Sequence, residues 1–181
     1  MKAVETNLEG CFVLEPIIFK DKRGYFFESF NEEKFHTLIN NKVVFVQDNE
    51  SFSSKGVLRG LHYQVGEYAQ SKLVRVIKGK VLDVAVDLRA NSKTFGKHVA
   101  LELSEDNKKQ LFVPRGFAHG FIVLSDTAIF SYKCDNFYNK AAEGGIIYND
   151  PMLNIDWQLP DNELLVSKKD AILPTLENAK L

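Results

Sequence analysis

Apolar and polar residues alternate with a period of two through the middle of the chain. In the segment 81–88 every even position is Leu or Val, and the odd positions include Asp83 and Asp87. The segment 99–103 repeats the alternation. Because successive side chains on a strand point to opposite faces, this period predicts strands that each turn one face toward a core.

Turn residues separate these strands from their neighbours. Gly79 lies between two lysines and joins residues 73–77 to the strand at 81–88, so we expect these two segments to form a hairpin. Polar residues at 104–107 turn the next strand into residues 111–113, where a proline ends the strand. The centre of the chain is therefore predicted to be a series of short strands.

A second hairpin is expected around the turn Ser125-Asp126, which lies between the apolar segments 121–124 and 128–134. Period two places the even-numbered residues of the longer segment on one face, Tyr132 among them. A tyrosine on this face could project toward the inside of a barrel, together with the apolar side chains beside it.

Helix is predicted at only two short segments. Asn31 is a suitable N-cap for a helix with an acidic first turn and with Phe35 on its apolar face. Another short helix is expected to begin at Ser167, with Asp170 in the capping-box position. Many short strands, 14 Phe, 6 Tyr and little helix favour a mainly β fold, an antiparallel sandwich or barrel such as a jelly roll.

Composition narrows the function classes. A chain of 181 residues with 45% hydrophobic residues can build a real core, and we expect one domain over residues 1–181. The net charge of −1 leaves no excess positive charge for nucleic acid or an anionic membrane. No apolar run exceeds four residues, which predicts neither a membrane span nor a signal peptide and favours the cytoplasm. Cys11 and Cys134 form no metal motif and are expected to be buried apolar fillers.

Two histidines follow glycines near predicted strand ends, His62 in VLRGLHYQ and His119 in PRGFAHGF. In a small barrel, inward-pointing side chains converge at the mouth, where ligands usually bind. The run Pro-x-Gly-x-x-His around His119 resembles the second metal-binding motif of the cupin barrels. A metal site would also need a His-x-His pair, but Gln64 stands two residues after His62, so no metal is expected.

Short characteristic runs extend over nearly the whole chain. They are DKRGYFFESFN (21–31), QDNESFS (47–53), GVLRGLHYQ (56–64), KLVRV (72–76), VAVDLR (84–89), PRGFAHGF (114–121), YKCDNFY (132–138), EGGI (143–146), NDP (149–151) and SKKD (167–170). In this order they resemble the dTDP-sugar epimerase family, in which dTDP-4-dehydrorhamnose 3,5-epimerases convert dTDP-4-keto-6-deoxy-glucose to dTDP-4-keto-rhamnose. The resemblance implies an antiparallel double-stranded β-helix, a cupin-like jelly roll with a few short helices.

Inverting a carbon beside a ketone requires a base, an acid and a group that stabilises the enolate between them. The resemblance assigns the base to His62, oriented by Asp170, because a carboxylate can hold the correct imidazole tautomer. It assigns the proton donor to Tyr132, since a phenol with a pKa near ~10 stays protonated at neutral pH. Lys72 would stabilise the enolate, and no cofactor is needed.

The resemblance also implies a homodimer with exchanged N-terminal strands, in which the segment with Arg23 and Glu28 reaches the partner subunit's pocket. Arginines suit phosphate oxygens, and an aromatic ring suits stacking on a thymine. The implied substrate-binding residues for a dTDP-linked 4-keto-6-deoxyhexose are Arg23, Glu28, Gln47, Asp48, Asn49, Arg59, Lys72, His119, Tyr138, Glu143 and Lys168.

Each of these residues also has an ordinary interpretation. His62 and His119 could be hydrogen-bonded barrel histidines, Asp170 a helix cap, the tyrosines amphipathic aromatics and the basic residues solvated surface charges. Three other functions remain open at this point. They are a monofunctional 3- or 5-epimerase of a related sugar, a metal-dependent cupin oxygenase or isomerase, and a sugar-nucleotide binding module without catalysis.

Overall fold

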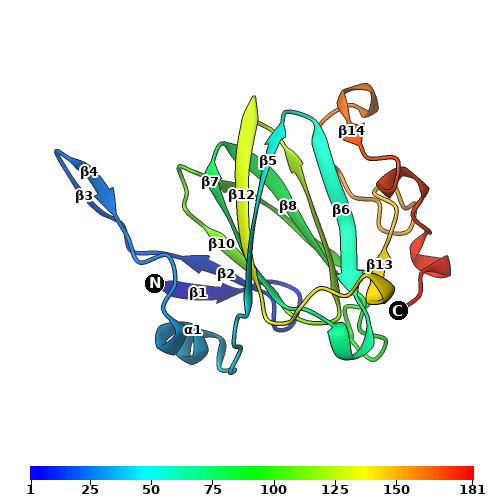
Figure 1. Cartoon of the computed structure of the whole chain (residues 1–181), viewed down its shortest axis with the longest axis horizontal. Coiled ribbons are helices and arrows are strands. Elements are labelled where there is room, and N and C mark those ends of the chain that lie inside the picture. Colours follow the sequence, from blue (N-terminus) through cyan, green and yellow to red (C-terminus); the bar gives the residue numbers. More distant parts are fainter.

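The computed structural model describes residues 1–181 and contains two antiparallel sheets that face each other (Figure 1). Sheet I has the strand order β1 (Lys2–Glu5), β2 (Phe12–Glu15), β10 (Gln110–Val113), β7 (Lys72–Lys78), β12 (Thr127–Cys134) and β5 (Gln47–Ser54). Sheet II has the order β13 (Glu143–Gly145), β6 (Val57–Gln64), β11 (Phe117–Val123), β8 (Lys80–Asp87) and β9 (His98–Ser104), with β14 (Leu165–Val166) parallel to β6.

Most consecutive strands of the barrel lie in opposite sheets, which makes the fold a jelly roll and confirms the predicted class. Both predicted hairpins are wrong as pairings. The strand β7 leads through Gly79 into β8, but β7 pairs with β10 and β12, whereas β8 pairs with β9 and β11. The strands β11 and β12 are likewise divided between the sheets. A turn signal marks a reversal of the chain and does not say whether the next strand joins the same sheet.

The core between the sheets is built from alternate residues of both sheets. On β12, Ala128 and Phe130 lie in this core and Tyr132 packs against it, which confirms the predicted common face. On β8, both faces are buried, and Val81 and Ala85 belong to the core between the sheets. The face of β8 that carries the two aspartates therefore looks into the barrel.

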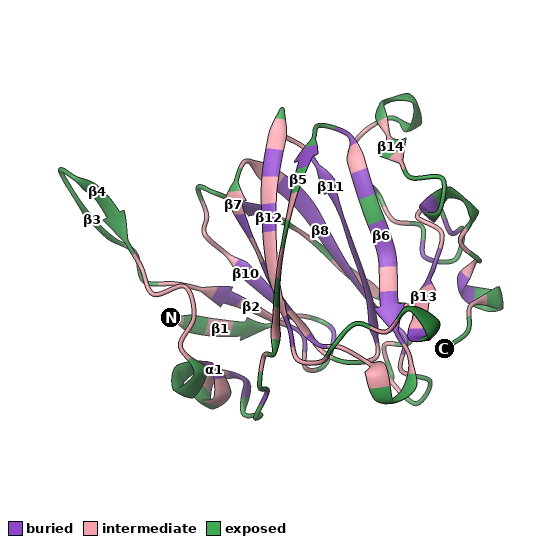
Figure 2. Ribbon diagram, viewed as in Figure 1, coloured by how far each residue is buried: buried purple, intermediate pink, exposed green.

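The outer faces of the two sheets have different covers. On sheet II, residues of β6 and β8 pack against Ile146, Leu153 and Trp157 of the C-terminal segment, so little of that sheet is exposed (Figure 2). On sheet I, the helix α1 (Glu32–Ile39) buries Phe35 and Ile39 against β2, β7 and β10. The C-terminal cover of sheet II explains why β8 is buried on both of its faces.

The helix predictions have different outcomes. Asn31 caps α1 as predicted, and its side-chain oxygen accepts a hydrogen bond from the Lys34 N–H at 3.1 Å. Ser167 accepts a hydrogen bond from the Asp170 N–H at 3.0 Å, but only a single 3₁₀ turn follows. The 3₁₀ turns are at Gly66–Tyr68, Lys140–Ala142, Asp161–Glu163, Asp170–Ile172 and Leu176–Asn178.

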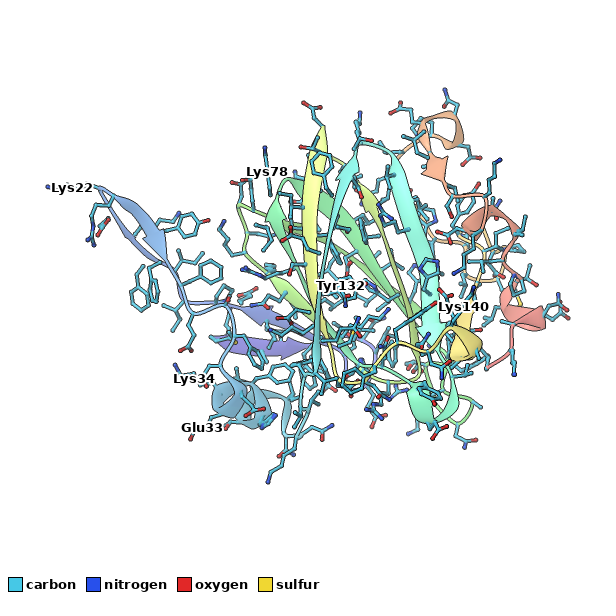
Figure 3. All side chains as sticks on the ribbon, viewed as in Figure 1. Lys22, Glu33, Lys34, Lys78, Tyr132 and Lys140 are labelled. Carbon is cyan, nitrogen blue, oxygen red and sulfur yellow. The ribbon has the colours of Figure 1, made fainter.

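A two-stranded arm, β3 (Phe19–Asp21) and β4 (Gly24–Phe26), extends away from the barrel (Figure 1). Figure 3 shows the side chains of this arm, with Lys22 at its tip. Its aromatic side chains are exposed, including Phe26 at 70%. Both cysteines are free and buried, as predicted. None of the helices is sufficiently long and apolar to cross a membrane.

Candidate active site

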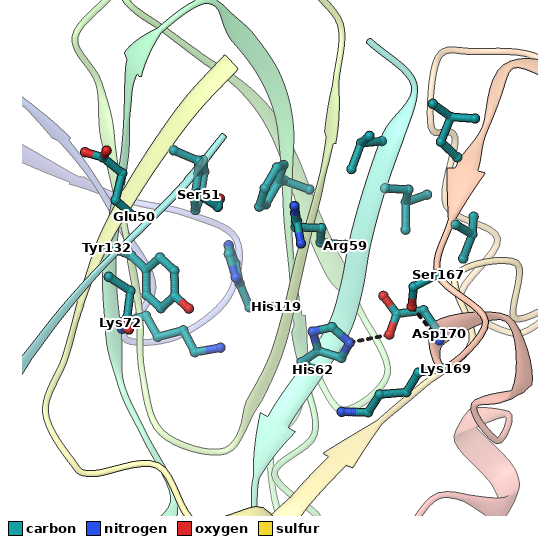
Figure 4. Close-up of a pocket in the computed structure, with 17 residues that line it drawn as sticks. Glu50, Ser51, Arg59, His62, Lys72, His119, Tyr132, Ser167, Lys169 and Asp170 are labelled. Atoms are coloured by element: carbon teal, nitrogen blue, oxygen red, sulfur yellow. Dashed lines mark hydrogen bonds and ion pairs between the residues drawn. The ribbon is translucent and has the colours of Figure 1, made fainter. Parts of the chain in front are cut away.

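A cavity of about 730 Å³ opens between the two sheets, and side chains from both sheets and from the C-terminal segment line it (Figure 4). A second cavity of about 340 Å³ shares four lining residues with it, namely Asn49, His62, Lys72 and Tyr132. The two cavities therefore form one continuous site around these four side chains.

On the sheet II side of the cavity, His62 of β6 contacts Asp170 with 2.7 Å between Nε2 and Oδ1. The His62 side chain is 32% exposed, and the Asp170 side chain is 5% exposed. Burial alone would raise the pKa of Asp170, but the hydrogen bond and charge of His62 and the N–H of Gly60 lower it. Asp170 is therefore an ionised carboxylate that orients the ring, and its other interpretation as a helix cap does not describe its side chain.

A β-bulge turns His62 toward the cavity. In the pairing of β6 with β11, His119 lies opposite His62 and Phe121 lies opposite Arg59. A step of two residues along β11 therefore matches a step of three along β6, so Arg59 and His62 line the same cavity, whereas strict alternation would separate them. Gly60 allows this bulge, because a Cβ there would lie 2.6 Å from the Gly120 Cα, and its φ is +124°.

Tyr132 and Lys72 lie across the cavity from His62, with His119 between them in this view (Figure 4). Burial raises the pKa of Tyr132, so the phenol keeps its proton at neutral pH. Burial lowers the pKa of Lys72, while the charges of neighbouring groups, including Asp83, oppose that shift. Lys72 has no ion-pair partner, and its Nζ lies 5.9 Å from the centre of the Tyr132 ring. The cavity thus holds a proton acceptor, a proton donor and two cations without ion-pair partners, Lys72 and Arg59.

The smaller cavity carries polar side chains around an exposed aromatic ring. Tyr138 is 53% exposed, and its hydroxyl donates to Glu143 at 3.0 Å. Lys169 forms an ion pair with the same Glu143 at 2.6 Å. Gln47 donates to Asn49 at 2.9 Å, with both side chains on the inner face of β5. This region offers a stacking surface beside hydrogen-bonding groups.

Four predicted binding residues lie outside these cavities. Asp48 is on the outer face of β5, where it pairs with Lys133 at 2.8 Å, because strand alternation separates it from its neighbours Gln47 and Asn49. Lys168 is exposed, and the adjacent Lys169 lines the cavity instead.

The remaining two, Arg23 and Glu28, lie on the N-terminal arm and just after it. Arg23 donates from Nε to Asp21 at 3.0 Å, and Glu28 pairs with Lys34 at 2.8 Å. Neither lines the cavities of its own chain. The other predicted residues, Arg59, His119, Tyr138 and Glu143 among them, all line one cavity or the other.

Sequence reasoning missed two residues of the site. Lys169 could have been found only by deciding which lysine of the run SKKD faces inward. Asp83 of β8 contacts His119 of the adjacent strand β11, with 2.9 Å between Oδ1 and Nε2, and it is fully buried. An aspartate on an alternating strand normally indicates a solvent face, so the pattern gave the opposite expectation.

No three His, Cys, Asp or Glu side chains gather closely enough to hold a metal ion. Gln64 is buried, and its side-chain oxygen accepts a hydrogen bond from the Asn139 N–H at 2.8 Å.

Known proteins resemble this chain along almost its entire length. The sequence model of the dTDP-4-dehydrorhamnose 3,5-epimerase family matches residues 5–178. A protein of that name from Shigella flexneri is 54% identical over 170 residues, which are 94% of this chain and 93% of that protein.

Two crystal structures have the same fold. The dTDP-4-dehydrorhamnose 3,5-epimerase of Elizabethkingia anophelis is 57% identical with a TM-score of 0.95, covering 98% of this chain and 97% of that chain. The dTDP-6-deoxy-D-glucose-3,5-epimerase of Legionella pneumophila, in complex with dTDP-4-keto-L-rhamnose, is 47% identical with a TM-score of 0.94, covering 98% and 93%.

Proposed function

This chain belongs to the dTDP-4-dehydrorhamnose 3,5-epimerase family, and on that premise we propose that its cavity converts dTDP-4-keto-6-deoxy-glucose to dTDP-4-keto-L-rhamnose by inverting carbons 3 and 5. The observation that carries the proposal is the His62–Asp170 pair facing Tyr132 and Lys72 across one cavity. Proton transfers alone make and consume an enolate next to a ketone, so the proposal uses no cofactor.

His62 removes the proton from the carbon beside the ketone. Its Nε2 is directed at Asp170, which leaves Nδ1 with its lone pair for the substrate. The electron pair of the C–H bond forms a double bond to the carbonyl carbon, and the π pair of the ketone moves onto its oxygen. The enolate forms while His62 becomes an imidazolium. The ionised Asp170 stabilises that imidazolium, which lowers the barrier to proton removal.

Tyr132 returns a proton to the same carbon from the opposite face, and the configuration inverts. Lys72 stabilises the enolate oxygen until then, because a cation in a buried cavity acts with little screening by water. Solvent exchange afterwards removes the proton from His62 and restores the one on Tyr132. A second cycle at the other carbon completes the reaction.

The remaining side chains would hold the nucleotide. Arg59 faces the cavity beside Ser53, to which its Nε donates at 3.1 Å, and its guanidinium is suited to the diphosphate. The exposed ring of Tyr138 is suited to stacking on thymine. Lys169, which pairs with Glu143, takes the binding role first assigned to Lys168.

The proposal includes a cytoplasmic homodimer in which the arm of one subunit completes the pocket of the other. The exposed Phe19, Tyr25 and Phe26 support it, because aromatic side chains that gain no burial in their own chain favour a partner surface. The position of Arg23 on this arm, away from its own cavities, agrees with that arrangement.

A mixing experiment tests the shared pocket. In a heterodimer of His62→Ala and Arg23→Ala, one pocket contains both an intact His62 and an intact Arg23 from the partner. Each variant alone is expected to be weak, and random exchange should restore about a quarter of the wild-type activity. If mixing leaves the activity unchanged although an affinity tag on one variant co-purifies the other, Arg23 acts within its own subunit or has no role.

The reaction itself is tested by incubating the protein with dTDP-4-keto-6-deoxy-glucose in deuterated water and following carbons 3 and 5 by NMR. Deuterium and inversion at both carbons support the proposal. Labelling and inversion at one carbon would instead identify a monofunctional epimerase. No exchange at either carbon, with an active relative as control, would overturn the assigned substrate. Asp48→Ala, on the outer face, serves as a matched variant that should behave as the wild type.

A further inference from the structure

A second histidine–carboxylate pair lies at the wall of the cavity, where His119 lines the cavity and Asp83 lies behind it, and the proposed mechanism leaves this pair without a role. His119 of β11 and Asp83 of β8 are both buried, with 2.9 Å between Nε2 and Oδ1. The other oxygen of Asp83, Oδ2, is buried without any hydrogen-bond partner. A fully buried carboxylate requires compensation for its lost hydration, and only one of its two oxygens has a visible donor.

The surroundings of this pair are mostly apolar. The ring of His119 stacks on Phe130 with 6.0 Å between ring centres, and Phe130 stacks on Phe121 at 4.2 Å. Few dipoles are therefore available to screen the charge of Asp83, and that charge acts strongly on cations nearby. The titratable and charged groups that face the pair from the adjoining elements are Cys11, Arg59, His62 with Asp170, Lys72 and Tyr132.

Some of the charged groups around the cavity have an ion-pair partner, and others, Lys72 and Arg59, have none. His62 has Asp170, and Lys169 has Glu143. Lys72 has no ion-pair partner within hydrogen-bonding reach, and Asp83 is one of the charges that favour its protonated form against the effect of burial. Burial raises the pKa of Cys11 to about 12, so this thiol stays neutral. Asp83 is thus the buried carboxylate in contact with His119, and its charge acts together with Cys134 and Glu143 to favour the protonated form of Lys72.

The two pairs differ in what else holds the carboxylate. Asp170 also receives the backbone N–H of Gly60 at 3.4 Å, whereas Oδ2 of Asp83 receives nothing. A carboxylate without other donors favours a positive charge on its single partner more strongly. His119 is therefore suited to donate a hydrogen bond from Nδ1, and His62 is suited to accept a proton.

We propose that Asp83 is a positioning residue that keeps His119 and Lys72 positively charged, so that Nδ1–H of His119 and Nζ of Lys72 together donate to the oxygen of the enolate. This inference rests on the proposed function, because the enolate is its intermediate. It gives the site two donors at the point where negative charge develops, and such donors accelerate a reaction when they are fixed beforehand.

The variant Asp83→Asn tests this role, with Asp87→Asn as the matched control. Asp87 is equally buried on the same strand, but it binds Arg89, Ser92 and Thr94 away from the cavity. We expect Asp83→Asn to lower kcat by about 30- to 100-fold with KM changed less than about threefold. The alkaline limb of the pH profile of kcat should move to lower pH by about one unit or more, because His119 and Lys72 lose the negative charge that favours their protonated forms.

The control should lose stability and keep the wild-type pH profile. A loss of kcat in Asp83→Asn that is uniform in pH would overturn the inference while leaving the proposed function standing. If the wild type itself does not convert the substrate, the proposed function is contradicted. The inference about Asp83 is tested only on a substrate that the wild type converts, so the two failures are distinguishable.

A second measurement needs no substrate. In wild-type protein with ¹⁵N-labelled histidine, the two ring nitrogens of His119 are expected to be protonated at neutral pH, with the assignment made from the spectrum of His119→Gln. An unprotonated ring nitrogen on His119 under these conditions would overturn the proposed charge.

Discussion

The two histidine–carboxylate pairs of this cavity consist of the same residue types and differ in how the fold holds them. His119 and Asp83 lie on neighbouring strands of one sheet, and both are buried. His62 is 32% exposed, and its Asp170 arrives from a segment 108 residues further along the chain. The inner pair is part of the sheet and is shielded from solvent, whereas the histidine of the outer pair meets solvent and can exchange protons with it.

The largest expected effect comes from removing the base of the outer pair. His62→Ala should reduce kcat by about 10³- to 10⁴-fold, because general-base catalysis and the imidazolium charge are both lost. The rates of deuterium entry at carbons 3 and 5 measure the effect directly. His36→Ala, on α1 and outside both cavities, is the control. Activity of His62→Ala within tenfold of the wild type would remove the outer pair from the mechanism.

A smaller loss, about 10²-fold in kcat, is expected for Asp170→Asn, because an amide can leave His62 in the wrong tautomer and cannot balance its charge. The double variant His62→Ala/Asp170→Asn should be no slower than His62→Ala alone, since Asp170 acts through His62. Kinetics of the three variants form a double-mutant cycle. Additive losses would show that Asp170 acts independently of the ring.

The bulge that directs His62 inward can be broken separately. Gly60→Ala would place a Cβ 2.6 Å from the Gly120 Cα and 2.8 Å from the His119 carbonyl oxygen. We expect the free energy of unfolding in urea to fall by about 2–3 kcal/mol. Gly66→Ala is the control, because Gly66 also has a positive φ but has open space around it. Equal losses in the two variants would mean that conformation alone, and not the contact between β6 and β11, sets the cost.

The smallest effect concerns pH. The folded state lowers the pKa of Asp170, so its contribution to stability is complete above the unfolded pKa near ~4 and is lost as the pH falls below it. The difference in unfolding free energy between wild type and Asp170→Asn should therefore shrink by about 1 kcal/mol between pH 6 and pH 3. Urea titrations at several pH values measure it, and a constant difference would contradict the assignment.

Sequence alone was sufficient for the central strands from β7 to β12, for α1 and for several of their faces. Period two placed Tyr132 correctly, and the side chain of Asn31 caps α1 as predicted. The pairings were missed, because a glycine turn such as Gly79 looks the same at a hairpin and at a corner between two sheets. The family resemblance supplied the candidate site, which no local pattern around His62 would have distinguished from an ordinary barrel histidine.

Individual residues of the site depended on geometry that one sequence does not contain. Asp48 and Asn49 are adjacent and polar, and only the strand pleat separates them. The inward position of His62 next to Arg59 depends on a bulge, which needs the paired strand β11 to be defined. Asp83 looked like a solvent-facing residue because the C-terminal segment that covers the other face of β8 is distant in sequence.

That C-terminal segment has a consequence for synthesis on the ribosome. Both sheets are complete by β13 apart from the short β14, which ends at Val166, and Asp170 follows four residues later. Because domains fold as the chain emerges, the barrel can assemble before its catalytic carboxylate has left the exit tunnel. A chain whose translation stops before residue 167 would therefore carry a barrel with His62 but without the carboxylate that orients it, and such incomplete products should convert the substrate only slowly.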